Sequence, residues 1–561
     1  MSAEAGGGRM RREFTFPDRP GFRLLVENGR LDFFAADWQL FSFPVSSAVE
    51  TDAGTDADLS LYYSGETEEN GVTKLVWRAE NALWEKKEYV VSVCRDHVSY
   101  EMRVQGGGQP KGILYFRGGA NSPAARYYVS ACLYCQAEDM DYEREKRFVG
   151  QDLFMYPGMA SPPPFVFPFF NDCNDSVMAL GVAAERGKNV YSRLNVRYVK
   201  PQAMWLELPF DTGAAFETQW TAPTVWFGFG DSDFGLIAEY ADWCRAYFGY
   251  PAPPDPARQP AWWKRPIFCG WLEQVFIMGN GSGRTKQAAT QVNYEAMIAR
   301  MDRAGLGPGI IIIDDKWQTD YGTMEPDADK WPDLRAFCDR RHAEGRKVLL
   351  WWRLWAPDGL SDTECIRDAG VNVTADPTSP AYRERLETVI RRLLGSGKGC
   401  MDCDGFKLDY IYRLPPSDIC GAPYEPGVAG MELMHRYYET VYRIAKSVKP
   451  DALINTSVAH PYFADVFDQI RLHDYNAAQR STVSIMRFRA AFVRAVFPNA
   501  LIDTDGANFF TGNSQHILYH NRAAVSVGVP SLYGLWPLTD EELREIQSVW
   551  DEYEKRFVEI E

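Results

Sequence analysis

Lys407 and Asp409 lie two positions apart in the run Asp-Gly-Phe-Lys-Leu-Asp-Tyr, which spans residues 404–410. The run is typical of a short buried strand, and because side chains alternate along a strand, we expect both charged groups on one face. A cation beside a carboxylate keeps the carboxylate ionised, as a carboxylate nucleophile or a stabiliser of a cationic transition state requires. A structural ion pair at a strand end would use the same residues, so this run alone leaves both readings open.

Carboxylates also close other apolar runs in the second half of the chain. One carboxylate at the end of a strand is often a helix cap, but four strands that end in this way indicate a site. These additional acidic residues are Asp314, Asp315, Asp474, Asp503 and Asp505.

The pair Asp409 and Asp474 is predicted to be catalytic. Two carboxyl groups on opposite sides of a pocket are the minimum for cleavage of a glycosidic bond, since one attacks and the other protonates the leaving oxygen. Asp409 is the better nucleophile because Lys407 would favour its charged form. Asp474 then becomes the acid/base, and its neighbours, including His473, supply no fixed cation that would hold it ionised.

The other polar and aromatic residues near these strand ends are predicted to bind substrate. Carboxylates such as Asp314 and Asp315 can accept hydrogen bonds from sugar hydroxyls, while the Trp rings either stack on a sugar ring or belong to the core. The predicted substrate-binding residues are Asp314, Asp315, Trp317, Trp351, Arg353, Lys407, His473 and Asp505.

After about residue 260, short apolar runs alternate with helical stretches, which is typical of a parallel sheet. Eight such runs in roughly 300 residues match a (β/α)8 barrel, so the predicted fold class is an α/β TIM barrel preceded by a β-sandwich. The active site of such a barrel lies at the carboxyl ends of the strands, where the acidic residues occur. The eight runs are 266–271, 309–315, 347–353, 405–410, 452–456, 469–474, 500–505 and 530–535.

The first part of the chain shows alternating apolar runs, such as 89–94 and 97–104, between Gly-, Asn- and Asp-rich turns. This pattern predicts an N-terminal β-sandwich domain over residues 1–250, which ends in a helix around 234–247. The Pro-rich stretch 251–260 is predicted to be a stiff linker, and 261–561 the catalytic barrel. The last helix is expected to start with a capping box at Thr539 and Glu542.

Residues 156–170 form a second Pro-rich segment, which contains several Phe residues. It has too many prolines for a central strand and is too apolar for a solvated loop. We therefore expect it to pack against the second domain, the rim of a site or another subunit, and the sequence does not choose between these.

The 561 residues carry a formal net charge of -16, which argues against nucleic acid and anionic membranes as partners and favours a small saccharide or glycoside. The eleven Cys lack metal-type spacing except for one C-x-x-C at Cys400 and Cys403, so we expect reduced thiols. Residues 1–12 contain no signal-peptide core, and no run is long enough to cross a bilayer. We expect a cytoplasmic protein without a cofactor. The sequence does not decide whether it forms a homo-oligomer.

The order of the motifs resembles the melibiase clan of retaining α-glycosidases, a glycoside hydrolase family 36-like group that includes α-galactosidases, with the family 31 α-glucosidases as more distant relatives. The match covers about residue 261 to the end. The resemblance implies a retaining exo-α-glycosidase that acts on α-galactoside-type glycosides. It implies sugar contacts at Asp314, Asp315, Trp317 and Trp351, a nucleophile at Asp409 after Lys407, and an acid/base at Asp474.

This chain departs from the clan at four places. Leu408 stands where the clan usually has an aromatic residue, and residues 456–460 replace a Cys- and Gly-rich loop that contacts the sugar substituent at position two. His473 replaces a Ser, and Arg353 stands where an acidic residue is common. The identity of the sugar therefore does not follow, and Arg353 together with Lys407 favours an anionic sugar as one hypothesis.

Alternative functions follow from the same residues. An α-glucosidase-like or sulfo- or uronic-sugar glycosidase, or a transglycosylase, would share the mechanism. A metal-dependent barrel enzyme would hold a divalent cation with Asp314, Asp315 or Asp503 and use Lys407 as base. A carbohydrate-binding protein without catalysis is the third class.

Overall fold

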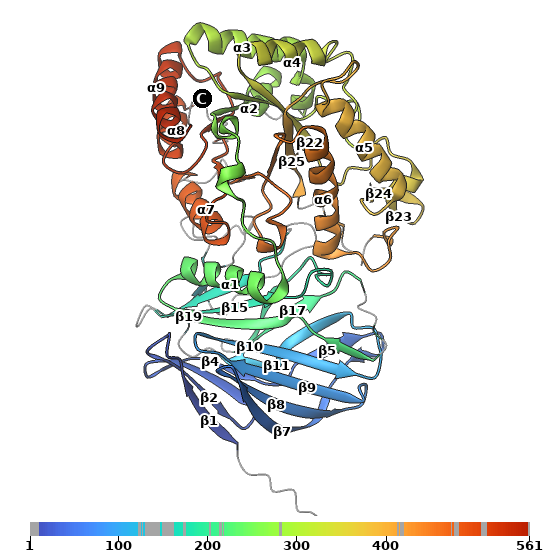
Figure 1. Cartoon of the computed structure of the whole chain (residues 1–561), viewed down its shortest axis with the longest axis vertical. Coiled ribbons are helices and arrows are strands. Elements are labelled where there is room, and N and C mark those ends of the chain that lie inside the picture. Colours follow the sequence, from blue (N-terminus) through green and yellow to red (C-terminus); the bar gives the residue numbers. More distant parts are fainter. Residues whose placement is uncertain are drawn as a thin grey trace, which may run out of the picture. The chain divides into compact units, whose positions relative to one another are not determined.

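The computed structural model describes residues 10–121, 125, 127–129, 146–148, 162–171, 176–200, 203–212, 216, 218–279, 283–411, 414–415, 420–472, 474–475, 482–506 and 513–558. The chain divides into two compact units (Figure 1). One contains most of the chain up to Tyr250 together with Gly427–Glu432, and the other contains Pro251–Pro426 and Leu433–Glu561.

The first unit consists of two antiparallel sheets, so the predicted β-sandwich is confirmed. One sheet has the order β1-β2-β3-β4-β11-β17-β16, with β5 on β11 and β6 on β5, and the other has the order β13-β12-β14-β15-β19-β10-β9-β8-β7, with β18 on β10. The strands are β1 (Arg11–Thr15), β2 (Phe22–Glu27), β3 (Arg30–Ala35), β4 (Trp38–Pro44), β5 (Ala48–Thr51), β6 (Gly54–Thr55), β7 (Asp58–Glu69), β8 (Val72–Asn81), β9 (Lys86–Val93), β10 (His97–Gln105), β11 (Gly112–Asn121), β12 (Tyr127–Val129), β13 (Lys146–Phe148), β14 (Val166–Phe170), β15 (Val177–Ala183), β16 (Asn195–Lys200), β17 (Ala203–Pro209), β18 (Gln219–Thr221) and β19 (Thr224–Gly230).

Buried phenylalanines join the two sheets. The ring of Phe227 on β19 lies 5.0 Å from Phe33 on β3 and 5.2 Å from Phe43 on β4, measured between ring centroids. Such aromatic contacts bury much apolar surface per residue, which explains why many of the aromatic residues in this half occupy the inward positions of alternating strands. Helix α1 (Asp233–Phe248) follows, capped by Ser232, whose side chain accepts a hydrogen bond from the Gly235 amide.

The Pro-rich segment 156–170 was not expected to form a central strand. This expectation was wrong for the part of the segment that the structure describes. Val166–Phe170 forms β14 between β12 and β15. Pro168 opposes Ala179 of β15, whereas β12 pairs only with Phe169 and Phe170. A proline lacks the amide hydrogen that a ladder needs, and it is tolerated here because the pairing with β12 ends at Phe169. Residues 156–161 lie outside the described part of the chain.

The second unit contains a parallel eight-stranded sheet with the order β28-β27-β26-β25-β22-β21-β20-β29, and the predicted barrel is confirmed. All eight predicted runs contain one of its strands. They are β20 (Ile267–Cys269), β21 (Ile310–Ile313), β22 (Lys347–Arg353), β25 (Gly405–Asp409), β26 (Leu453–Thr456), β27 (Gln469–Arg471), β28 (Leu501–Asp503) and β29 (Ser531–Leu532).

Hydrogen bonds at Val529 close the sheet into a barrel. The Val529 amide donates to the Ile502 carbonyl at 2.7 Å, and the Thr504 amide donates to the Val529 carbonyl at 3.1 Å. The Ile267 amide donates to the Pro530 carbonyl at 3.0 Å, which joins the last strand to the first. A closed barrel leaves no free edge, and it fixes the direction in which every strand end points.

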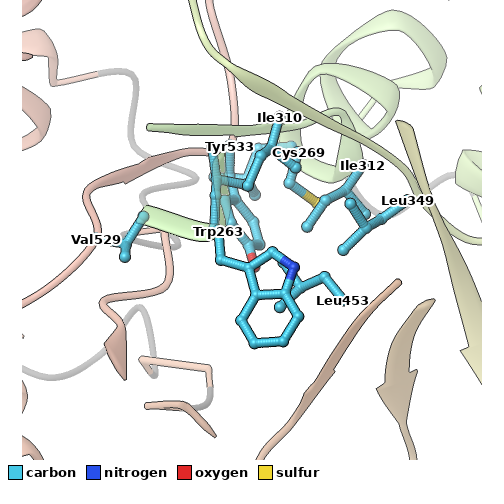
Figure 2. Packing of buried hydrophobic residues seen from close by; sticks show 10 residues of the cluster. Trp263, Cys269, Ile310, Ile312, Leu349, Leu453, Val529 and Tyr533 are labelled. Atoms are coloured by element: carbon cyan, nitrogen blue, oxygen red, sulfur yellow. The ribbon is translucent and has the colours of Figure 1, made fainter. Parts of the chain in front are cut away.

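Alternating side chains fill the barrel interior. Figure 2 shows Ile310 and Ile312 of β21 close to Cys269 of β20. Ile267 of β20 belongs to the same cluster, and all four residues are fully buried. The three isoleucines are β-branched, which suits short strands that are buried on both faces. The cluster also contains Trp263, Leu272, Leu349, Leu453, Val529 and Tyr533.

Helices follow the barrel strands, and Figure 1 shows their places. The last one starts as predicted, because the Thr539 side chain accepts from the Glu542 amide and the Glu542 side chain accepts from the Thr539 amide. No helix in the described part of the chain is long and apolar enough to cross a membrane. The helices are α2 (Trp271–Met278), α3 (Gln291–Ala304), α4 (Leu334–Ala343), α5 (Pro380–Leu394), α6 (Gly430–Val448), α7 (Thr482–Val496), α8 (Ser514–Ala524) and α9 (Asp540–Phe557), and the short hairpin β23 (Cys365–Asp368) and β24 (Val371–Ala375) precedes α5.

Candidate active site

Asp409 lies at the carboxyl end of β25, and three donors from the described part of the chain hold it. One oxygen accepts from the Trp351 indole at 2.9 Å, and the other accepts from the Tyr410 amide at 2.8 Å and from Arg471 at 3.0 Å. Tyr410 adopts a φ of 59°, a left-handed backbone that a residue with a bulky side chain rarely takes. The strand end therefore turns sharply at this point while the carboxylate stays fixed in one orientation.

Arg471, at the end of β27, joins three carboxylates. Its two terminal nitrogens lie 3.0 Å from Asp409, 3.0 Å from Asp474 and 2.8 Å from Asp505. The Arg471 and Asp505 side chains are buried, whereas 54% of the Asp474 side chain is exposed. The guanidinium of Arg471 therefore links carboxyl groups at or just after the ends of three different strands, β25, β27 and β28.

Two sequence-based expectations about charge are therefore wrong. Lys407 was expected to be the cation beside Asp409, but its ammonium donates to Asp314 at 2.8 Å and acts on Asp409 only through its charge, and the guanidinium of Arg471 makes the direct contact. Asp474 was expected to lack a fixed cation, yet it pairs with the same Arg471. The contacts of Lys407 with Asp314 and of Arg471 with Asp409 could not be predicted, because they join strands that are distant in the sequence, whereas Arg471 and Asp474 are only three positions apart.

The pair of Lys407 and Asp314 is completely buried under the barrel mouth. The Cys269 thiol donates to the same Asp314 oxygen at 3.0 Å, and the Lys407 ammonium lies 4.9 Å from the centre of the Tyr533 ring. Burial lowers the pKa of Lys407, but the charges of Asp314, Cys269 and Asp409 together raise it more, so the net shift is upward. Lys407 is thus a permanent cation rather than a base.

Asp315 points to Tyr321 in the loop that follows β21. The Tyr321 hydroxyl donates to Asp315 at 2.7 Å, and the Lys286 ammonium lies 3.8 Å from its other oxygen. Burial raises the pKa of Asp315 to about 6, although the Tyr321 hydrogen bond and the charge of Lys286 oppose the shift. The carboxyl group of Asp315 consequently changes its charge near neutral pH.

The two predicted Trp residues support the site from within the barrel. Trp317 is fully buried, and its indole donates to the Trp351 carbonyl at 2.9 Å, so it packs in the core of the barrel. Trp351 is buried as well, and it contacts the rings of Tyr321 and Tyr410 edge-on at 5.8 and 5.9 Å. Both residues orient their neighbours, and Trp351 also orients Asp409.

Arg353 ends β22 beside Asp409 in the register of the sheet. Its guanidinium lies 4.7 Å from the ring centre of Tyr321 and 4.8 Å from that of Tyr410. Cation–π contacts of this kind hold a guanidinium in place without neutralising it.

The remaining residues named from the sequence are His473, Asp505 and Asp503, together with His460 of the loop 456–460 that departs from the clan. His473 lies outside the described residues. Asp505 is the buried partner of Arg471 and has a φ of 58°, while Asp503 accepts from Asn455 at 2.9 Å and from Ser531. In the loop after β26, His460 is buried, which lowers its pKa to about 3.

Sequence reasoning missed Arg471 and Tyr321. An Arg within an apolar strand, three residues before a candidate acid, was a usable signal for Arg471, because a buried guanidinium needs carboxylate partners. Tyr321 lies in a loop without periodic pattern and had no such signal. All described residues of the predicted site nevertheless lie at the carboxyl ends of the barrel strands or in the loops that follow them, as in other barrels with this architecture.

The sandwich and the barrel are together similar to solved glycosidases. The galactosidase domain of the α-galactosidase-sucrose kinase AgaSK matches with a TM-score of 0.56 at 15% identity over 91% of this chain and 74% of that one. The GH36 α-galactosidase AgaA from Geobacillus stearothermophilus, in complex with 1-deoxygalactonojirimycin, gives 0.56 at 15% identity over 91% and 75%. A GH31 sulfoquinovosidase from E. rectale, in complex with an aza-sugar inhibitor, gives 0.60 at 9% identity over 94% and 82%.

These structures belong to the two groups that the motifs resemble, and at such identities they establish the fold. No protein-family model and no curated protein matches the sequence.

Proposed function

We propose that this protein is a retaining exo-α-glycosidase that acts on α-galactoside-type glycosides. The observation that supports this function best is the pair of carboxyl groups, Asp409 and Asp474, that one buried Arg471 holds at the carboxyl end of the barrel. Asp409 is fixed by three donors, as a nucleophile requires, while the exposed Asp474 can exchange protons with solvent and substrate.

In the first step, an Asp409 oxygen attacks the anomeric carbon while Asp474 gives its proton to the departing glycosidic oxygen. The product is a glycosyl ester of Asp409 and a free alcohol. In the second step, Asp474 takes a proton from water, the water oxygen attacks the anomeric carbon, and the Asp409 ester bond breaks. Two inversions leave the α-configuration unchanged, and an alcohol in place of water gives transglycosylation.

Arg471 supports both steps. Its guanidinium contacts Asp409 and Asp474 at the same time, so it orients the nucleophile and the acid relative to each other in the first step. Once Asp409 has formed the ester it has lost its charge, and Arg471 then stabilises Asp474 as the carboxylate that the second step needs. Asp505 keeps the guanidinium in place throughout, because it is fully buried.

The glycone is proposed to bind at Asp315 and Tyr321. The Asp315 carboxylate accepts hydrogen bonds from sugar hydroxyls, as the resemblance implies for this position. Asp314 serves a different purpose in this chain, because Lys407 and Cys269 already occupy one of its oxygens.

The alternative of a metal-dependent barrel enzyme requires Lys407 as a base. The ammonium of Lys407 is paired with Asp314 and its pKa is raised, so it is unsuited to that role. The described residues also contain no group of three or more His, Cys, Asp or Glu side chains placed to hold a metal ion. A non-catalytic carbohydrate binder would not need the exposed acid at Asp474.

The experiment is hydrolysis of a panel of aryl α-glycosides, with aryl β-glycosides as controls, by the wild-type protein and by Asp409→Ala. NMR follows the anomer released, and a parallel reaction contains a chelator. We expect an α-configured sugar from the wild type only, with or without the chelator. A β-configured first product, or loss of activity in the chelator, would contradict the proposal.

A further inference from the structure

Cations gather on one aromatic residue at the barrel mouth. The Arg353 guanidinium and the Lys316 ammonium each lie 4.7 Å from the Tyr321 ring centre, and the Lys286 ammonium lies 5.1 Å from it. A fourth cation, Lys330, donates to the carbonyls of Lys316 and Lys286 at 2.8 and 3.1 Å. We call Lys286, Lys316, Lys330 and Arg353 the cationic cluster.

The positive charge of this cluster is poorly compensated. Lys286 has the Asp315 carboxylate at 3.8 Å, but among the described residues no carboxylate lies within 4.0 Å of the Arg353 or Lys316 side-chain nitrogens. Burial lowers the pKa of Lys330, and the charge of Lys316 lowers it further, while Asp327 and Asp315 oppose the shift. Mutual repulsion of this kind costs stability unless an anion binds.

The cluster adjoins the proposed reacting groups. Arg353 is next to Asp409 in the sheet register, and Tyr321, which carries the cations, donates to Asp315. A sugar whose anomeric carbon is at Asp409 and whose hydroxyls reach Asp315 would therefore present its other substituents to Arg353 and Lys316. Guanidinium and ammonium groups recognise carboxylate and sulfonate oxygens by charge-assisted hydrogen bonds.

The geometry points to an anion-binding site at Arg353 and Lys316 that recognises a carboxylate or sulfonate group on the glycone, so that the substrate is an anionic α-glycoside. This inference rests on the proposed function and narrows its substrate class. It differs from the expectation drawn from the sequence, because Lys407 is already paired and Lys316 takes its place. The whole chain is acidic, with a formal net charge of -16, and would repel an anion at long range. Salt screens exposed charges beyond about 8–10 Å, so the local cluster decides the affinity.

The test is binding of matched sugar pairs by calorimetry to Asp409→Ala protein, which cannot form the glycosyl ester. One pair is methyl α-galactopyranoside and its 6-carboxylate, and the other is methyl α-glucopyranoside and its 6-deoxy-6-sulfonate. We expect one anionic sugar to bind about 10- to 100-fold more tightly than its neutral partner, because hydrogen bonds to charged groups contribute that much. The pair with the larger ratio identifies carboxylate or sulfonate.

Variants in the same background assign the site. Arg353→Ala and Lys316→Ala should each bring the anionic-to-neutral ratio close to one, and Arg353→Lys should retain part of it. The matched control is Arg303→Ala, which removes the same charge from the exposed end of α3, and it should keep the wild-type ratio.

The inference is overturned if no sugar of either pair binds, if the ratio in the parent protein is one or less, or if the ratio survives in Arg353→Ala and Lys316→Ala. These outcomes are separate from failure of the proposed function. Hydrolysis of neutral aryl glycosides without preference for the anion would remove only this inference. Tight anion binding without hydrolysis of any glycoside would remove only the catalytic role.

Discussion

At the scale of single residues, the site depends on one cation that serves several carboxylates. Arg471 contacts Asp409, Asp474 and Asp505, and its own side chain is almost completely buried. A buried charge network of this kind is costly to assemble and is strongly destabilised when one partner is removed. The network has a functional role that offsets this loss of stability if it keeps a nucleophile and an acid at a fixed separation.

The first prediction is that Arg471→Met lowers kcat by about 100-fold or more, because the fixed charge that orients both carboxylates is lost. We expect a stability loss of about 3–5 kcal/mol as well, since Asp505 is left buried without its cation. Steady-state kinetics and urea unfolding measure the two effects.

The double variant Arg471→Met/Asp505→Asn separates the effect on kcat from the effect on stability. It removes the unpaired buried charge, so it should recover part of the stability and none of the kcat. A double variant that recovers kcat would show that Arg471 acts only on folding.

A second residue-scale prediction concerns pH. Asp315 must be ionised to accept two hydroxyl hydrogen bonds, and burial raises its pKa to about 6, so kcat/KM should fall as the pH drops through about 6. The Tyr321 hydrogen bond lowers this pKa, hence Tyr321→Phe should move the acidic limb to higher pH. The pH profile of kcat/KM checks this with Tyr519→Phe, at an exposed position on α8, as control. A limb that stays in place, or moves to lower pH, would contradict the role of Asp315.

At the scale of elements, the strands were predictable because their patterns are local. The run Ile310–Ile313 consists of four β-branched residues and ends in two carboxylates, so both the strand and its acidic end follow from the sequence. The partners of the cations were not predictable. Lys407 and Asp314 are 93 positions apart, and Arg471 and Asp409 are 62 apart, so only the closed barrel brings them together.

The close approach of β25 to β26 at Gly405 gives an element-scale prediction. Gly405 has a φ of 153°, and a Cβ there would lie 2.1 Å from the backbone oxygen of Leu453. Gly405→Ala should therefore displace β25, lower the free energy of unfolding by about 1–3 kcal/mol and reduce kcat, because Lys407 and Asp409 lie on this strand.

Chemical denaturation and kinetics test this against Gly397→Ala. Gly397 has no neighbouring atom within 4 Å of its added Cβ, so this control should change neither quantity much. Equal effects of the two substitutions would show that the strand contact does not position the site.

At the scale of the whole molecule, the acidic balance sets the conditions for these measurements. The formal net charge is -16 and the pI is about 5.1. Proteins associate most readily where their net charge vanishes, so we predict a solubility minimum near pH 5.1, which light scattering across pH would detect. A solubility minimum well above pH 6 would mean that the net charge does not control association. Aggregation would then also narrow the pH range over which the kcat/KM profile that reports on Asp315 can be measured.

The whole architecture delivers two carboxyl groups from separate strands to one guanidinium, and the central claim is that Asp409 is the nucleophile and Asp474 the acid/base. Azide rescue distinguishes the two roles by stereochemistry. With an activated aryl α-glycoside that the wild type hydrolyses, Asp409→Gly leaves room for azide to attack directly, whereas Asp474→Gly still forms the glycosyl ester that azide then opens.

The decisive measurement is the NMR configuration of the glycosyl azide from each variant. We predict the β-azide from Asp409→Gly and the α-azide from Asp474→Gly. The reverse pattern, or the absence of any azide product from both variants of an active enzyme, would contradict the assignment of the two carboxyl groups.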